Sequence, residues 1–168
     1  GKIFQVLSYE HIKMGRGSAN IKVKVKDIRS GAILDKSFIN GAKVEEVALS
    51  KKDLQFLYKD GGIAYFMDPS TFEQISISLS KLSGHEFLKE GKTFSLNFLG
   101  DEPLLLNIPP KMELKIAETG PSARGNSATN IYKEAILENG LKTKVPLFIK
   151  IGDLVRIDTR SGEYSERA

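Results

Sequence analysis

The stretch Asn20-Ile21-Lys22-Val23-Lys24-Val25-Lys26-Asp27-Ile28 alternates apolar and basic residues. Successive side chains of a β-strand point to opposite faces, so this period of two predicts a strand. Its apolar face carries Ile21, Val23 and Val25, and its basic face carries Lys22, Lys24 and Lys26. A basic stripe of this kind is typical of a solvated surface, and its regular spacing also suits contacts along a phosphate backbone.

The rest of the chain shows the same short strands, separated by turn signals. Residues 54–58 and 63–67 flank Asp60-Gly61, a pair that predicts a hairpin because both residues accept positive φ. Further strands are expected at residues 92–99, 112–117, 144–149 and 154–158. Helix is scarce, and residues 79–89, interrupted by Gly84, are the best candidate for a helical turn. The pattern predicts an all-β protein of small barrels or sandwiches.

Two boundaries divide the chain into three predicted domains, at residues 1–46, 47–109 and 110–168. The first boundary follows the basic segment, and the second lies at Pro109-Pro110, where ladder hydrogen bonds are interrupted. Of the net charge of +4, the three segments carry +4, −2 and +2 in that order. The two basic ends favour a polyanionic partner such as RNA, with a solvated surface as the equal alternative.

Composition excludes several classes of function. The chain has no cysteine and only two histidines, His11 and His85, so disulfides, Cys-ligated zinc and thiol catalysis are excluded and a metal site is not expected. No apolar run could span a bilayer and no signal peptide is visible, which predicts a cytoplasmic protein. Asp101-Glu102 has the context of a turn. We find no catalytic motif, and we expect neither a cofactor nor enzymatic activity.

One loop is unusual. Met14-Gly15-Arg16-Gly17-Ser18 lies between the strand expected at residues 3–9 and that at residues 20–28, so it should close a hairpin. The two glycines leave little bulk around Arg16, whose planar guanidinium suits phosphate. Taken alone, such a loop is also typical of a plain solvated turn.

Longer stretches carry a family resemblance. They are Leu57-Tyr58-Lys59-Asp60-Gly61, Phe66-Met67-Asp68, Thr71-Phe72-Glu73-Gln74, Lys133-Glu134-Ala135, Gly140, Val145-Pro146-Leu147-Phe148-Ile149, Ile151-Gly152, and Asp158-Thr159-Arg160-Ser161-Gly162-Glu163-Tyr164 with Arg167. In this order, and over essentially the full length, they resemble the bacterial elongation factor P family.

The resemblance implies an SH3-like (KOW-type) barrel followed by two OB-folds, arranged as an L-shaped mimic of tRNA. It implies a monomer that binds the 70S ribosome and its RNA between the peptidyl and exit sites. There the family contacts peptidyl-tRNA and relieves stalling at consecutive prolines. The resemblance also implies that the family's first strand precedes Gly1, in a chain that opens without an initiator methionine.

Arg16 occupies the tip position at which the family often has a modified lysine. An arginine there excludes β-lysylation, and some members with arginine carry a rhamnose added by a glycosyltransferase. The surrounding residues look more like the lysine-type loop, so rhamnosylated and unmodified Arg16 both stay open.

The resemblance also implies RNA contacts elsewhere. Lys13 and the stripe of Lys22, Lys24 and Lys26 would touch the RNA backbone near the acceptor end. Gly125, Asn126, Ser127 and Tyr132 lie in or beside a loop that would approach the exit-site mRNA codon, although this loop lacks an acid and several glycines usual in the family. Arg160, Tyr164 and Arg167 would face the small subunit. Local packing competes as the role of Tyr132, and core packing as that of Tyr164.

Two alternatives to the factor itself remain. The first is the elongation-factor-P-like paralogue, which shares the architecture and often has arginine at the tip. The altered loop at residues 126–132 favours the paralogue, whereas the ending at residues 158–164 favours the factor. The second is a generic OB-fold RNA-binding module, which would bind free single-stranded RNA with a steep salt dependence.

Overall fold

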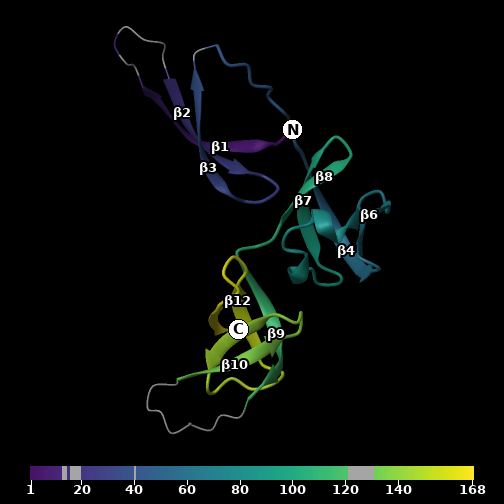
Figure 1. Cartoon of the computed structure of the whole chain (residues 1–168). Coiled ribbons are helices and arrows are strands. Elements are labelled where there is room, and N and C mark those ends of the chain that lie inside the picture. Colours follow the sequence, from purple (N-terminus) through teal and green to yellow (C-terminus); the bar gives the residue numbers. More distant parts are fainter. Residues whose placement is uncertain (13–14, 16–19, 40, 121–130) are drawn as a thin grey trace. The chain divides into compact units, whose positions relative to one another are not determined.

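The structure is a computed structural model that describes residues 1–12, 15, 20–39, 41–120 and 131–168. These residues form three antiparallel sheets (Figure 1), which confirms the all-β prediction. The first sheet has the order β1-β2-β3. Its strands are β1 (Phe4–Ile12), β2 (Asn20–Asp27) and β3 (Ile33–Ile39).

The other two sheets share one strand order. The second runs β6-β5-β4-β7-β8 and the third β11-β10-β9-β12-β13, so the first strand in sequence lies at the centre of each. The second sheet contains β4 (Ser50–Asp60), β5 (Ile63–Met67), β6 (Gln74–Ser78), β7 (Thr93–Leu99) and β8 (Glu102–Asn107). The third contains β9 (Lys111–Thr119), β10 (Tyr132–Leu137), β11 (Lys142–Pro146), β12 (Leu154–Asp158) and β13 (Tyr164–Arg167).

All of the predicted strands are present, most of them with shifted ends. The expected hairpin at Asp60-Gly61 joins β4 to β5. The strand expected at residues 144–149 is β11, which ends at Pro146, and Ile149 is buried beyond it. Proline cannot donate to a sheet ladder, and both Pro103 in β8 and Pro146 in β11 lie in strands at the ends of their sheets.

The expected helical turn is split into two 3₁₀ turns, η1 (Leu79–Lys81) and η2 (His85–Phe87), on either side of Gly84. Gly84 has φ +88°, and a Cβ there would lie 2.9 Å from Cγ1 of Ile108. Both the backbone conformation and this close approach therefore require glycine.

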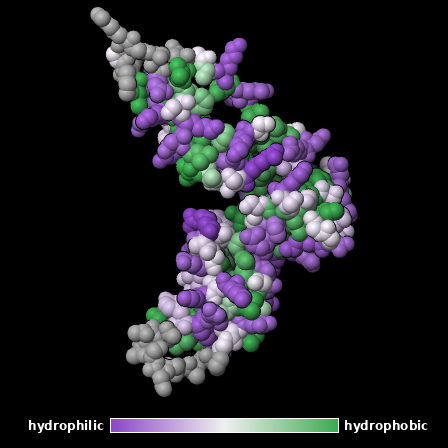
Figure 2. Space-filling view, viewed as in Figure 1, coloured by the Kyte–Doolittle hydropathy of each residue, from purple (hydrophilic) through white to green (hydrophobic). Residues whose placement is uncertain are grey.

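By contacts the chain divides into two compact units. One comprises Gly1–Ser83 and Glu90–Asn107, and the other comprises Gly84–Lys89 and Ile108–Ala168. The division into three domains at residues 46 and 109 stays a prediction. Hydrophobic and hydrophilic residues are interspersed over the face of the chain seen in Figure 2.

The core of the second sheet is aromatic and aliphatic. Leu54, Phe56, Phe66 and Leu96 are almost fully buried. The rings of Phe56 and Phe66 meet edge to face, with centroids 5.5 Å apart. The first sheet has much less core, because Val23 and Val25 are its only buried hydrophobic residues among those described.

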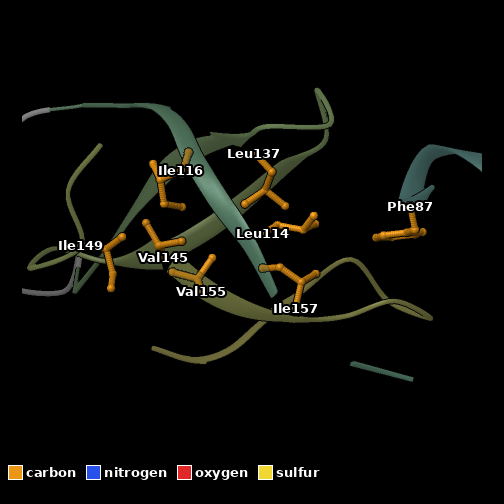
Figure 3. Close-up of a cluster of buried hydrophobic side chains, with 9 residues drawn as sticks. Phe87, Leu114, Ile116, Leu137, Val145, Ile149, Val155 and Ile157 are labelled. Carbon is orange, nitrogen blue, oxygen red and sulfur yellow. The ribbon is translucent and has the colours of Figure 1, made fainter. Parts of the chain in front are cut away.

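The core of the C-terminal unit includes Phe87, which precedes the third sheet in the sequence. Phe87, only 4% exposed, packs in a cluster with eight aliphatic residues of the third sheet and its loops, among them Leu114 and Ile157 (Figure 3). Asn139 Nδ2 donates to the carbonyl of Glu86 over 3.1 Å. The η2 turn is thereby attached to the C-terminal unit, although its sequence lies between β6 and β7.

One six-residue loop recurs in all three sheets. It joins β2 to β3 at residues 27–32, β5 to β6 at residues 68–73, and β12 to β13 at residues 158–163. Each loop begins with an aspartate whose N–H donates to the carbonyl five residues later, at 2.9 Å. The carbonyl of the same aspartate accepts the N–H four residues later, at 2.8 Å.

Side chains complete each loop in the same way. The carboxylate of the aspartate accepts the backbone N–H two residues later, at 2.9 Å for Asp27, 2.8 Å for Asp68 and 2.9 Å for Asp158. A serine or threonine hydroxyl at the fourth position accepts the N–H of the sixth, at 3.3 Å in every loop. The aspartate therefore satisfies turn N–H groups that the sheet ladder leaves unpaired.

These bonds favour the ionised aspartate. The N–H of Ser30, with that of Arg29 and the charge of Lys2, lowers the pKa of Asp27. The guanidinium of Arg160, followed by its backbone N–H, lowers the pKa of Asp158 far below its ordinary value.

Truncation of Phe87 should selectively destabilise the C-terminal unit. We expect Phe87→Ala to cost about 3–5 kcal/mol, because it empties a core position. Urea unfolding followed by circular dichroism, with methyl NMR signals of Val145 reporting on this unit, measures the change. Phe148→Ala is the matched control, since Phe148 is 58% exposed. Equal effects of the two variants would contradict the placement of Phe87.

Acid should weaken the third sheet through Asp158. A lowered pKa in the folded state stabilises the fold above the ordinary aspartate pKa of about 4, and this contribution is lost as the pH falls below that value. We expect Asp158→Asn to show a shallower loss of thermal stability between pH 5 and pH 2 than the parent protein. Asp101→Asn is the control. Parallel curves for the parent and Asp158→Asn would refute this role.

Candidate nucleic-acid interface

The hairpin of β1 and β2 carries the predicted tip loop. The two strands pair from Phe4 with Asp27 to Ile12 with Asn20, with one irregularity between Val6 and Ser8. Residues 13–19 therefore connect the adjacent ends of two paired strands, as the sequence predicted. Among these residues only Gly15 is described, and it is exposed with φ +25°. The predicted contacts Lys13, Met14, Arg16, Gly17 and Ser18 lie outside the described residues.

The lysine stripe lies on the exposed face of β2, and the opposite face is partly buried, as expected. Strand pairing adds neighbours that the sequence of β2 alone could not show. Lys22 lies between Glu10 and Ser37, and Lys24 lies between Ser8 and Asp35. Lys26 lies between two uncharged residues, Gln5 and Ile33. Opposite charges on neighbouring strands attract one another, so Lys26 keeps the least compensated charge of the three.

The candidates of the third sheet are only partly described. Gly125, Asn126 and Ser127 lie outside the described residues. Tyr132 is the first residue of β10, pairs with Pro146 on β11, and is 52% exposed. Tyr164 is partly buried and packs against the hydrophobic cluster that includes Phe87. The position of Tyr164 therefore supports a packing role alongside any RNA contact.

The two C-terminal arginines are each paired with an aspartate. Arg160 Nη2 donates to Asp158 Oδ2 over 2.8 Å, and its Nε donates to Asp158 Oδ1 over 3.2 Å. Arg167 Nη2 donates to Asp153 Oδ1 over 3.3 Å. Both arginines are largely exposed, and exposed ion pairs are weak in water. A phosphate can therefore displace the aspartates at modest cost, but the aspartates lower the local net positive charge that would attract RNA from a distance.

The basic candidates and Tyr164 fall into two groups. Arg16 and the lysines belong to the β1–β2 hairpin, and Arg160, Tyr164 and Arg167 belong to the β12–β13 hairpin. The groups lie in different units.

Phe72 is an exposed residue that stands out in the sequence only as part of a family motif. The signal that would have singled it out is the recurrent loop. The fifth position of that loop is glycine at Gly31 and Gly162 but phenylalanine at Phe72.

Among the described residues, no three His, Asp or Glu side chains are grouped closely enough to hold a metal ion. No helix in the same part of the chain is long and apolar enough to cross a membrane.

Comparison with known proteins covers the whole chain. The family model described as Elongation factor P (EF-P) KOW-like domain matches residues 1–44, the Elongation factor P (EF-P) OB domain matches residues 49–106, and Elongation factor P, C-terminal matches residues 112–167. The first sheet therefore belongs to a KOW-like domain, and the second sheet belongs to an OB domain.

Curated relatives agree with these models. Elongation factor P of Moorella thermoacetica is 41% identical over 169 residues, covering 100% of this chain and 91% of that protein. Elongation factor P of Clostridium kluyveri is 39% identical over 168 residues, covering 99% and 91%. A solved structure of eukaryotic translation initiation factor 5A from Methanococcus jannaschii matches with a TM-score of 0.48 and 19% identity, covering 62% of this chain and 77% of that chain. On the three family models and the two elongation factor P relatives, the chain belongs to the elongation factor P family of translation elongation factors.

Proposed function

We propose that this protein binds the 70S ribosome between the peptidyl and exit sites and stimulates peptide-bond formation at consecutive prolines. The proposal is carried by the family models that match residues 1–44, 49–106 and 112–167, together with the two paired strands that residues 13–19 connect. In this proposal Arg16 lies close to the acceptor end of the peptidyl-tRNA.

The proposed physical task of the protein is to align the acceptor end of the peptidyl-tRNA for reaction. Proline is a poor nucleophile, and a polyproline nascent chain disfavours a productive geometry of the peptidyl-tRNA. The ribosome supplies the chemistry, so a bound factor contributes by holding the acceptor end in a reactive position. Such positioning lowers an entropic barrier and needs no catalytic group on the factor.

The residues of the first hairpin suit that task. Arg16 carries a permanent charge and a planar fork of donors that suits phosphate. Of the three lysines in the stripe, Lys26 has no acidic neighbour in the strand pairing and is the best placed to contact the RNA backbone. Contacts of this kind position a protein without reading sequence.

The remaining predicted contacts complete the proposed binding mode. Arg160, Tyr164 and Arg167 would approach the small subunit, and residues 125–127 with Tyr132 would approach the exit-site mRNA codon. The internal pairing of Arg160 and Arg167 supports a weak affinity for free RNA. That weakness favours the ribosome-specific factor over a generic RNA-binding module, because charge drives non-specific RNA binding.

Arg16 can be tested by the rate of tripeptide formation on a Pro-Pro-Pro message in a reconstituted system. We expect the protein from its native host, with any modification of Arg16 in place, to raise this rate. Arg16→Ala should reduce the stimulation about ten- to a hundredfold, because misplacement of a reacting group by about 1 Å has effects of that size.

The matched control is Lys43→Ala, which also removes one exposed positive charge from the first segment. Mass spectrometry of the tip peptide distinguishes rhamnosylated from unmodified Arg16. A parent protein that leaves the rate unchanged would refute the proposed function. Stimulation restricted to other stalling motifs would instead favour the paralogue.

A further inference from the structure

The turn between β10 and β11 contains an asparagine followed by a glycine, Asn139-Gly140. Asparagine is thermolabile in proteins, and a following glycine favours its deamidation because glycine has no Cβ to hinder the approach of its own backbone nitrogen. That nitrogen attacks Cγ of Asn139 and closes a succinimide ring, while its proton and the side-chain nitrogen leave together as ammonia. Water then opens the ring to give aspartate or isoaspartate.

The turn is open to solvent. Gly140 is exposed and Asn139 is half-buried. Gly140 has φ +84°, and a Cβ built there would meet no atom within 4 Å, so no neighbouring group shields this side of the turn. Water and hydroxide, the co-reactants of deamidation, therefore reach the turn, and the conformation of the two residues decides whether the reaction proceeds.

Hydrogen bonds hold both reacting groups in place. The N–H of Gly140 donates to the carbonyl of Leu137 over 2.8 Å. On the side chain of Asn139, Oδ1 accepts the N–H of Leu141 over 3.3 Å, and Nδ2 donates to the carbonyl of Glu86 over 3.1 Å. The attack needs the nitrogen and Cγ to meet in a near-attack geometry, which these bonds oppose. The amide is thus fixed by the turn on one side and by η2 on the other.

The bond to Glu86 depends on the docking of η2. Phe87, the next residue, is only 4% exposed in the core cluster of the third sheet. Lys89 Nζ donates to Glu138 Oε1 over 3.1 Å, so a second contact joins this segment to the same turn. Because η2 is only three residues long, it can open locally without unfolding of the sheet. Such opening releases the amide of Asn139.

We propose that Asn139 is a deamidation site whose reaction rate is controlled by the docking of η2. While η2 is docked, the fixed amide reacts slowly. When η2 opens, Cγ of Asn139 is free to meet the nitrogen of Gly140. This inference does not depend on ribosome binding, and it adds a chemical modification to the C-terminal unit.

The product of the reaction cannot restore the original contact. An ionised carboxylate has no hydrogen to donate, so it faces the carbonyl of Glu86 without a bond. It also adds a negative charge next to Glu138, and like charges repel. Isoaspartate further lengthens the backbone of the turn, because its chain runs through Cγ. Deamidation therefore weakens the attachment of η2 irreversibly, and a modified molecule opens more readily than an unmodified one.

The first experiment measures the rate of deamidation. The full chain is kept at mildly alkaline pH, and mass spectrometry follows the tryptic peptide of residues 134–142. We expect the native parent to react about tenfold more slowly than the parent unfolded in urea, where the turn is open. Phe87→Ala should react about fivefold faster than the native parent, because it removes the side chain that docks η2.

The matched control is Ile149→Ala, which shortens a side chain of the same core. Ile149 and Phe87 lie at opposite ends of the cluster (Figure 3). Both variants are compared in buffer in which circular dichroism shows the sheets intact, and Ile149→Ala should react close to the parent rate. A native parent that reacts as fast as the unfolded chain, or a Phe87→Ala variant that reacts no faster than Ile149→Ala, would overturn the proposal.

The second experiment tests the consequence and needs no core variant. Asn139→Asp places the aspartate product in every molecule. NMR hydrogen exchange follows the N–H groups of Phe87 and Leu88, which donate within the η2 turn. We expect both to exchange about tenfold faster than in the parent, while the N–H of Phe66 in the second sheet keeps its rate. Unchanged exchange at Phe87 and Leu88, or an equal acceleration at Phe66, would contradict control of Asn139 by η2.

Discussion

The fold depends on an aspartate, at the end of a strand or directly after it, whose carboxylate accepts hydrogen bonds from N–H groups of the following turn. The arrangement occurs once in each sheet, at Asp27, Asp68 and Asp158, with the same backbone bonds to within 0.1 Å. A tight turn between antiparallel strands leaves N–H groups that the ladder cannot pair, and an ionised carboxylate satisfies them without lengthening the loop. Because the turn sets which residues of the two strands face one another, the aspartate also fixes which side chains reach each core.

Local sequence patterns predicted the strands whose apolar and polar faces can be distinguished in the sequence. The alternation in residues 20–28 identified β2 almost to its ends, and Asp60-Gly61 identified the β4–β5 hairpin. Short polar strands such as β13, residues 164–167, gave no such signal, because the neighbouring strand determines their conformation. The attachment of Phe87 to the C-terminal core was equally hidden, since it joins residues that lie far apart in sequence.

The sequence predicts the types of residue in the candidate site better than it predicts how far nearby acidic groups compensate their charge. The lysines at alternate positions of β2 and the arginines near the C-terminus are exposed, and their contact with RNA stays a prediction. Strand pairing determines the acidic neighbours of Lys22 and Lys24. Loop geometry determines that of Arg160. Such compensation lowers non-specific attraction to RNA and leaves recognition to shape and to a few uncompensated groups. The proposed binding at one ribosomal site would benefit from that balance, because the protein would leave most other RNA alone.

The most direct test of the account is a cryo-electron microscopy structure of this protein on a ribosome stalled at consecutive prolines. We expect density between the peptidyl and exit sites, with residues 13–19 touching the acceptor end of the peptidyl-tRNA and Arg16 within reach of its backbone. Binding at another site, or with the β1–β2 hairpin directed away from the acceptor end, would contradict it.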